Sequence, residues 1–264
     1  MENWGRMPMG NKLVGRYNFV SEEFHNDFTH HLFWGELGQE MLNASDYHSN
    51  EHGLGMDYMN SIHRTWVLSR LAIEMEDMPV VNRKYTIETW VESILRSFTC
   101  RNFAIIDSLS HQIYGYARSI WAVIDTQTRQ PVDLGSIKDG SILQYVNKEK
   151  TCPIAKTSRV QVGADAVKVR TVNTYYSDVD INGHINSIRY IDHILDLFDL
   201  DYYRNNTLKR FEIAYVAESH QGDKLNFYRE NEGNGVYAFK VTKTEPQSSK
   251  EVEVVRSKAI FIKK

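Results

Sequence analysis

The same order of elements occurs twice along the 264-residue chain, and this internal repeat limits the fold more than any other feature. Each half begins with a strand-like segment, continues into one amphipathic helical stretch and ends in four further strand-like segments. A helix with one apolar stripe must bury it, and the apolar face of an antiparallel sheet can cover it. We therefore expect an α+β fold made of two successive sheet-and-helix units.

The first half contains one predicted helix and five predicted strands. A strand is predicted at 13–20 and a helix over 31–47. The helix carries one apolar stripe, formed by Phe33, Leu37, Met41 and Leu42. Segments rich in Val, Ile, Thr, Trp and Tyr, with partial period-two alternation, predict four more strands at 65–75, 83–95, 97–107 and 112–124.

The second half repeats this order. A strand is predicted at 166–176 and a helix over 186–200. The later strands are predicted at 208–217, 224–229, 235–244 and 251–262. An antiparallel sheet wrapped around one long helix is the hot-dog architecture, so the repeat predicts a tandem (double) hot-dog fold. We expect a first half at 1–134, a less periodic connector at 135–163 and a second half at 164–264.

Composition fits a globular protein and argues against some classes of function. The hydrophobic fraction of 42% is ordinary for globular domains, so a sizeable core can form. The net charge of −3 argues against a general nucleic-acid binder, which usually presents a strongly basic face. The two cysteines, Cys100 and Cys152, form neither a disulfide framework nor a metal cluster by their spacing. We expect no metal, no cofactor and a reducing environment.

No targeting or membrane segment is predicted. Met1–Gly10 lacks the apolar core of a signal peptide, and the pattern of a transit peptide is also missing. No run approaches the ~18 apolar residues that a membrane span needs. These features favour a cytoplasmic protein.

The segment 177–190 (SDVDINGHINSIRY) is the strongest candidate for chemistry. Four polar side chains occupy alternate positions up to the start of the predicted helix: Asp180, Asn182, His184 and Asn186. A helix N-terminus presents unpaired backbone N–H groups and the positive end of the helix dipole. Such a place favours an anion or a carbonyl oxygen that becomes an oxyanion, so we expect the functional site here.

Three structural alternatives are open for this segment. Helix capping by Asp or Asn explains one of the polar residues but not all of them. An ordinary polar turn is the second alternative. The third is calcium binding, because Asp178, Asp180, Asn182 and Gly183 copy the start of an EF-hand loop. The twelfth loop position is Arg189, where a bidentate Glu is required, and this cation disfavours calcium.

Histidine and cysteine patterns elsewhere offer weaker candidates. His48–His52 (HSNEH) matches the zinc-protease pattern H-x-x-E-H, which requires both histidines on one face of a helix. Gly53 and Gly55 follow at once, so we predict that this segment is a fraying helix end. Cys100 lies in a predicted strand and Cys152 in the connector, both far along the chain from the polar cluster, so neither is expected to be a nucleophile.

At SDVDINGHIN the chain resembles the plant-type acyl-ACP thioesterases, which carry a near-identical D-x-N-x-H-x-N segment where the second hot-dog helix begins. Further similar stretches occur in the family's order: HLFWGELGQEMLNASDYHSNEHG, RTWVLSRLAIEMEDMP, SIWAVIDTQTRQPVDL and FEIAYVAES. The resemblance covers about residues 13–262. It implies an enzyme of fatty acid biosynthesis, a thioester hydrolase that releases fatty acid from acyl-ACP.

The resemblance also implies site residues, with the catalytic roles falling on Asp180, Asn182, His184 and Glu218. Some plant members carry a Cys after the catalytic Glu, whereas this chain has Ser219, so a cysteine mechanism cannot operate there. When the two halves are aligned, Met78 occupies the place of Glu218. We therefore expect that the second half carries the chemistry and that the first half holds the acyl chain.

The expected mechanism is attack by water. Glu218, assisted by Asn182, is expected to orient and deprotonate the water, while Asp180 orients His184 and fixes its tautomer. His184 and the N-terminal amides of the helix would stabilise the tetrahedral oxygen. Which of the two carboxylates is the base stays open.

The implied partner is acyl carrier protein, an acidic helical protein that bears phosphopantetheine. Electrostatic attraction would require a local basic face, for which Arg189, Lys209 and Arg210 are the candidates. An acyl-CoA thioesterase on the same fold and a non-enzymatic acyl-binding protein remain open alternatives. A hot-dog dehydratase is less favoured because its helix lacks this opening. The sequence leaves acyl chain length, saturation and assembly as a homodimer undecided.

Overall fold

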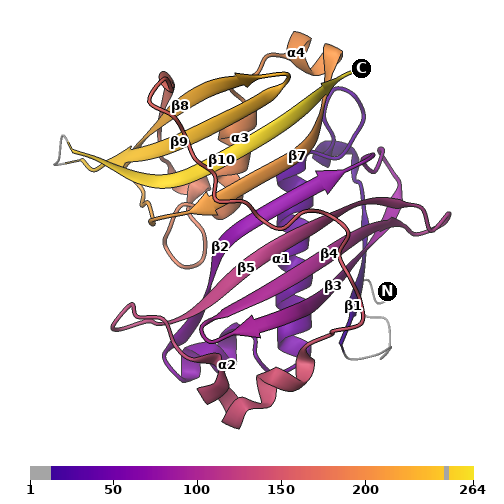
Figure 1. Cartoon of the computed structure of the whole chain (residues 1–264), viewed down its shortest axis with the longest axis vertical. Helices are drawn as coiled ribbons and strands as arrows, with labels where there is room; N and C mark the ends of the chain where they lie inside the picture. The colour runs from indigo at the N-terminus through magenta and orange to yellow at the C-terminus, as the bar shows by residue number, and fades with distance from the viewer. Residues whose placement is uncertain (1–12, 247–249) are drawn as a thin grey trace. The chain divides into compact units, whose positions relative to one another are not determined.

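The protein is described by a computed structural model that covers residues 13–246 and 250–264 (Figure 1). Its residues group into two compact units. Unit 1 contains the chain up to Lys156, except for the short segment Arg70–Ala72. Unit 2 contains that segment and Thr157–Lys264. Met1–Gly10, for which the sequence predicts no signal peptide, lies outside the described residues.

Unit 1 consists of a five-stranded sheet and a long helix. The strands lie in the order β1-β3-β4-β5-β2. Their bounds are β1 Gly15–Val20, β2 Arg64–Met75, β3 Lys84–Leu95, β4 Phe98–Asp107 and β5 Ile113–Asp125. Strand β3 pairs antiparallel with β1 and β4, and β4 pairs antiparallel with β5. Helix α1 (Trp34–Glu51) lies against one face of this sheet and is followed by the short α2 (Met56–Ser61) (Figure 1).

Helix α1 packs on the sheet through small and apolar side chains. Leu37 and Met41 have no exposed surface, as the predicted stripe requires. From the sheet, Phe103 is also fully buried, while the fully buried Trp90 belongs to a separate cluster with Ala104, Cys152 and Ile154. Burial of side chains of this size stabilises the fold by about 1.5–3 kcal/mol each. Phe33 departs from the prediction, because it is the residue before the helix and 47% of its surface is exposed.

Unit 2 repeats the plan with a shorter helix. Its strands lie in the order β7-β10-β9-β8-β6. Their bounds are β6 Val167–Asn173, β7 Asn206–Tyr215, β8 Lys224–Gly233, β9 Val236–Thr244 and β10 Glu251–Lys263. Neighbouring strands pair antiparallel. Helix α3 (Ser187–Leu195) buries its apolar face, and Ile191 and Ile194 are fully buried with Phe227 and Phe239 of the sheet.

The predicted helix over 186–200 is wrong in its length. Helix α3 ends at Leu195, and a separate α4 spans Leu200–Asn205. The break has a local cause, because Asp199 adopts an extended backbone and its carboxylate accepts a 2.7 Å hydrogen bond from the Tyr202 N–H. Asp is a strong N-cap, so a new helix begins where the periodicity alone suggests that the first one continues.

The connector predicted at 135–163 contains structure that its weak periodicity did not reveal. Short 3-10 turns span Leu134–Tyr145, interrupted by residues with left-handed backbone angles. Leu134, Ile137 and Ile142 are buried in one cluster with Leu54 and Met59. This part of the connector therefore belongs to the core of unit 1. Among the residues that the structure describes, no helix is long and apolar enough to cross a membrane.

Candidate functional site

The four residues singled out by the sequence all lie in unit 2, on two loops. Asp180, Asn182 and His184 lie in the turn that leads into α3. Glu218 lies in the loop that follows β7, three residues beyond its last residue, Tyr215. Met78 follows the end of β2 at Met75 by the same distance, in agreement with the alignment of the halves.

The turn before α3 is held by the Asp180 carboxylate. Its Oδ1 accepts hydrogen bonds from the backbone N–H of Asn182 at 2.8 Å and of His184 at 3.2 Å. The Asp180 N–H in turn donates to the His184 carbonyl at 2.8 Å. Gly183 adopts a φ of +80°, a conformation that favours glycine and lets the chain reverse in so short a turn. Asp180 thus fixes the backbone from which the His184 side chain extends.

A backbone hydrogen bond joins the two loops beside the catalytic candidates. The Ile185 N–H donates to the Ser219 carbonyl at 2.8 Å. The residues just before this pair, His184 and Glu218, are therefore brought alongside each other. The far end of the second loop is held by Thr174, whose hydroxyl donates to the His220 carbonyl at 3.0 Å.

His184 and Glu218 face each other across this junction. The distance from His184 Nε2 to Glu218 Oε2 is 3.4 Å, with 27% and 36% of their side chains exposed. Both groups are thus reachable by a substrate yet partly shielded from water, which strengthens their interaction. An imidazole beside a carboxylate is a common arrangement for general acid–base chemistry.

The other two candidates do not join this pair as predicted. The Asp180 carboxylate orients His184 through the backbone, because its hydrogen bonds go to the N–H groups of Asn182 and His184; the bonds found for the described residues include none from Asp180 to the His184 ring, so the fixing of the tautomer stays a prediction. Asn182 is exposed, and the hydrogen bonds found within 13–246 and 250–264 give its side-chain amide no partner. The structure thus brings together one carboxylate and one imidazole, with Asp180 supporting the turn beneath them.

The first N–H groups of α3 are bonded to its own N-cap residue, Asn186. The Asn186 side chain accepts a 2.9 Å hydrogen bond from the Ile188 N–H, and its carbonyl accepts one from Arg189. Two N–H groups expected to stabilise an oxyanion are therefore already occupied. The helix contributes the positive end of its dipole to this region rather than those two donors.

Replacing Asn186 by Ala is expected to lower the free energy of unfolding by about 1 kcal/mol, because Ala leaves the Ile188 N–H without its cap. Urea unfolding followed by circular dichroism measures the change. Ser187→Ala, one position along, removes a side chain that makes no capping bond and serves as the control. Equal stability of the two variants would contradict the capping role.

The structure adds His220, which the sequence did not single out. Its ring centroid lies 5.0 Å from that of His184, in an edge-to-face arrangement. The only sequence signal was its position two residues after Glu218. Behind the turn, His193 Nε2 lies 4.0 Å from the carboxylate of Asp178, whose other oxygen accepts a 2.7 Å bond from the Tyr175 N–H.

The structure also bears on the alternative sites. Within the described ranges no group of three or more His, Cys, Asp or Glu side chains could hold a metal ion. The helix end predicted at His48–His52 is confirmed in position, because α1 ends at Glu51 with His52 as its C-cap, but the segment is helical up to that point and His48 is buried. The His48 Nδ1 lies 3.0 Å from the Arg101 guanidinium, a cation that disfavours a metal there. Burial raises the pKa of Cys152, which makes its thiolate less available.

Arg189 and Arg210, two of the three candidate docking cations, differ in their exposure to solvent. Arg189 is exposed at the start of α3 and contacts Asp192 at 3.3 Å. Arg210 was wrongly proposed, because it is 8% exposed and its Nε lies 2.8 Å from Glu212. A strand residue that points inward cannot be told from an exposed one when the strand's inward face is unknown.

Comparisons with known proteins identify the family. The acyl-ACP thioesterase N-terminal domain family matches residues 13–137, and the corresponding C-terminal domain family matches 161–260. A crystal structure of an acyl-ACP thioesterase from Bacteroides thetaiotaomicron is 45% identical, with a TM-score of 0.86 over 95% of this chain and 98% of that one. The 12:0-ACP thioesterase from Umbellularia californica, 17% identical, shares the fold with a TM-score of 0.84 over 98% and 100% of the two chains.

Curated relatives are more distant. Oleoyl-acyl carrier protein thioesterase 1 of Arabidopsis thaliana is 24% identical over 64% of this chain and 48% of its own length. The match thus spans about half of that protein.

The expected α+β fold of two hot-dog halves and the resemblance inferred from the motifs are both confirmed. The chain belongs to the acyl-ACP thioesterase family.

Proposed function

We propose that the protein hydrolyses fatty acyl-ACP to free fatty acid and acyl carrier protein, with His184 and Glu218 as the reacting pair. The observation that carries this proposal is the 3.4 Å approach of the two side chains on separate loops, both partly exposed. Family membership supplies the substrate class, and the pair supplies the base and the hydrogen-bond donor that thioester hydrolysis needs.

The reaction begins with a water molecule beside Glu218. The carboxylate takes one proton as the water oxygen bonds to the thioester carbon, and His184 donates a hydrogen bond to the carbonyl oxygen as it gains negative charge. Collapse of the tetrahedral intermediate breaks the C–S bond, and the leaving thiolate takes the proton from Glu218. Asp180 acts through the backbone by fixing the turn that carries His184. We assign to Asn182, which is exposed on the same turn, the contact of its amide with the water or the substrate.

The test is a panel of acyl-ACPs of different chain lengths, with the free fatty acid measured by mass spectrometry. The same acyl groups on coenzyme A form the comparison. We expect kcat/KM to be higher for acyl-ACP than for acyl-CoA. The reverse order would assign an acyl-CoA thioesterase, and no release from either series would assign a non-enzymatic acyl-binding protein. We also propose the cytoplasm as the compartment of this reaction, although the curated plant relatives are chloroplastic.

Replacing Ser219 by Ala is expected to leave kcat within about threefold of the wild-type value, because water rather than a serine hydroxyl attacks the thioester. Ser219 is 1% exposed, which keeps its hydroxyl away from a substrate. Steady-state kinetics on the best acyl-ACP provide the measurement. A hundredfold loss of kcat in a folded Ser219→Ala protein would replace the water mechanism by a serine nucleophile.

A further inference from the structure

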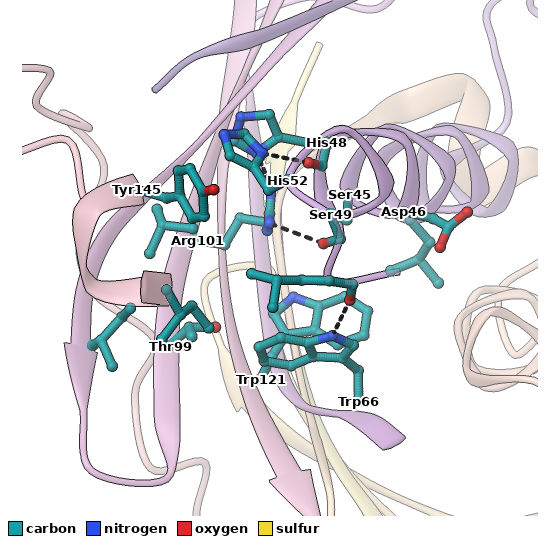
Figure 2. Close-up of a pocket in the computed structure, with 15 residues that line it drawn as sticks. Ser45, Asp46, His48, Ser49, His52, Trp66, Thr99, Arg101, Trp121 and Tyr145 are labelled. Atoms are coloured by element: carbon teal, nitrogen blue, oxygen red, sulfur yellow. Dashed lines mark hydrogen bonds between the residues drawn. The ribbon is translucent and has the colours of Figure 1, made fainter. Parts of the chain in front are cut away.

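Unit 1 contains a cavity of about 100 Å³ between α1 and the sheet (Figure 2). Most of its wall is apolar and comes from Leu42, Trp66, Val91, Ile94, Trp121 and Ile142. The Trp66 indole is fixed by a 3.0 Å hydrogen bond from its N–H to the Leu54 carbonyl. An engineered cavity of ~150 Å³ holds benzene, so this one holds at most a ligand of about that size.

A guanidinium group lies in this apolar wall. Arg101 comes from β4, lines the cavity and is only 7% exposed. It donates to His48 Nδ1 at 3.0 Å, to Thr89 Oγ1 at 3.1 Å and to Ser49 Oγ at 3.3 Å. All three acceptors are neutral, since a His48 nitrogen that accepts a bond is unprotonated. An arginine has five N–H donors, so two remain for a ligand.

The Arg101 charge has no carboxylate partner within 4 Å among the described side chains. Asp46 is the one carboxylate in the cavity lining, and its Oδ2 accepts a 2.9 Å bond from Asn50 instead. Figure 2 shows the Asp46 carboxylate pointing away from Arg101. Burial lowers the pKa of Arg101 to about 10, which still leaves the group charged at neutral pH.

A buried charge without a counter-charge is strongly unfavourable, and arginines in such places commonly pair with an anion. The planar guanidinium matches a carboxylate in geometry, with two parallel N–H···O bonds. The cavity around it is too small for a bulky headgroup, and its tryptophan and aliphatic walls suit a short hydrocarbon stem.

We infer that this cavity binds a carboxylate on a short apolar stem, with Arg101 as its counter-charge and Ser49 beside it. Two sources carry this chemistry. One is a free short-chain carboxylic acid that acts as a separate ligand. The other, which rests on the proposed function, is the far end of an acyl chain that itself ends in a carboxyl group.

Binding is tested on the wild-type protein with three four-carbon probes: butyrate, 1-butanol and butylammonium. Isothermal titration calorimetry at constant ionic strength gives Kd, and thermal unfolding gives the shift in Tm. Butyrate is expected to bind and raise Tm, whereas the alcohol and the amine are not. Equal binding of butyrate and butanol would overturn the inference, because an apolar cavity alone explains that result.

The variant Arg101→Met keeps the stem and removes the charge, and it is expected to weaken butyrate binding by about thirtyfold or more. Arg101→Lys keeps the charge and should bind with intermediate affinity. Arg16→Met, on an exposed arginine of β1, is the matched control and should bind as the wild type does. If the Arg101→Met variant fails to fold, the inference is tested by the affinity of Arg101→Lys for butyrate and by the comparison of the three probes on the wild type.

The source of the carboxylate is decided with two acyl-ACPs of equal length, one ending in methyl and one in carboxyl. A kcat/KM at least about tenfold higher for the carboxyl-ended chain, lost in Arg101→Lys or Arg101→Met, assigns the site to the substrate. No such preference, together with butyrate binding, assigns it to a free acid. Absence of both results overturns the inference. If neither acyl-ACP is hydrolysed, the proposed function fails, while the butyrate titration still tests the cavity.

Discussion

Glu218→Gln is expected to lower kcat for acyl-ACP hydrolysis by about 10² or more, because the amide cannot take the proton from water. His184→Ala should cause a loss of the same order, since it removes the donor that meets the developing oxyanion. Both side chains are partly exposed on loops outside the core, so the free energy of unfolding should change by no more than about 0.5 kcal/mol. Single-turnover kinetics and urea unfolding measure the two effects separately.

Glu232→Gln is the matched control for the carboxylate. Glu232 lies in the same unit, near the end of β8 that is distant from the Glu218 loop, and contacts Lys258 at 2.6 Å. Its turnover should equal that of the wild type. Turnover near the wild-type value in both Glu218→Gln and His184→Ala would end the assignment of this pair.

Asp107→Ala is expected to lower the free energy of unfolding by about 2–4 kcal/mol, the largest stability effect that we predict. Asp107 is 1% exposed at the end of β4. It accepts bonds from the Arg83 guanidinium, the Tyr114 hydroxyl at 2.7 Å, and the N–H groups of Leu109 and Ser110 at 2.9 and 2.7 Å. Truncation leaves all of these donors without their acceptor, including a Tyr114 hydroxyl that lies in the interior.

The contribution of Asp107 should also depend on pH. The Arg83 guanidinium and the other donors hold the pKa of Asp107 well below its usual range. A lowered pKa means that the stabilisation is complete above the unfolded-state value of about 4 and is lost as the pH falls further. The stability difference between wild type and Asp107→Ala should thus be constant from about pH 5 to 8 and shrink below about pH 4.

Asp133→Ala serves as the control for this experiment. Asp133 is exposed, and its side chain accepts one bond, from the Gly135 N–H at 2.9 Å. Its replacement should change the free energy of unfolding by less than about 1 kcal/mol, as for a single exposed turn contact. A pH-independent difference for Asp107→Ala would contradict the role given to its charge.

The sequence predicted the fold because the repeat and the strand composition reflect the whole architecture. Strand-like segments with alternating apolar residues identified all ten strands in the described part of the chain, with ends displaced by a few residues. Helix ends were less predictable, because they depend on single contacts. Asp199 starts α4 through one backbone hydrogen bond, which the apolar periodicity does not report.

The site was only partly predictable. The turn that holds His184 is formed by residues close together in the sequence, and its Asp, Gly and Asn residues are typical of such turns, so the turn could be predicted. The approach of Glu218 depends on a hydrogen bond between Ile185 and Ser219, which are 34 residues apart, and only the family resemblance indicated it. The Arg101–His48 contact joins a strand to a helix in the same way, so the sequence indicated His48 only as part of a weak metal pattern and Arg101 not at all.

The central claim is that His184 and Glu218 act as one unit on the thioester, and a double-mutant cycle tests it most directly. We would measure kcat on one acyl-ACP for the wild type, Glu218→Gln, His184→Ala and the double variant. If the two groups act together, the double variant should lose little more than either single variant. Losses that multiply in full, about 10⁴ from two losses of 10², would show that the groups act independently and would contradict the account.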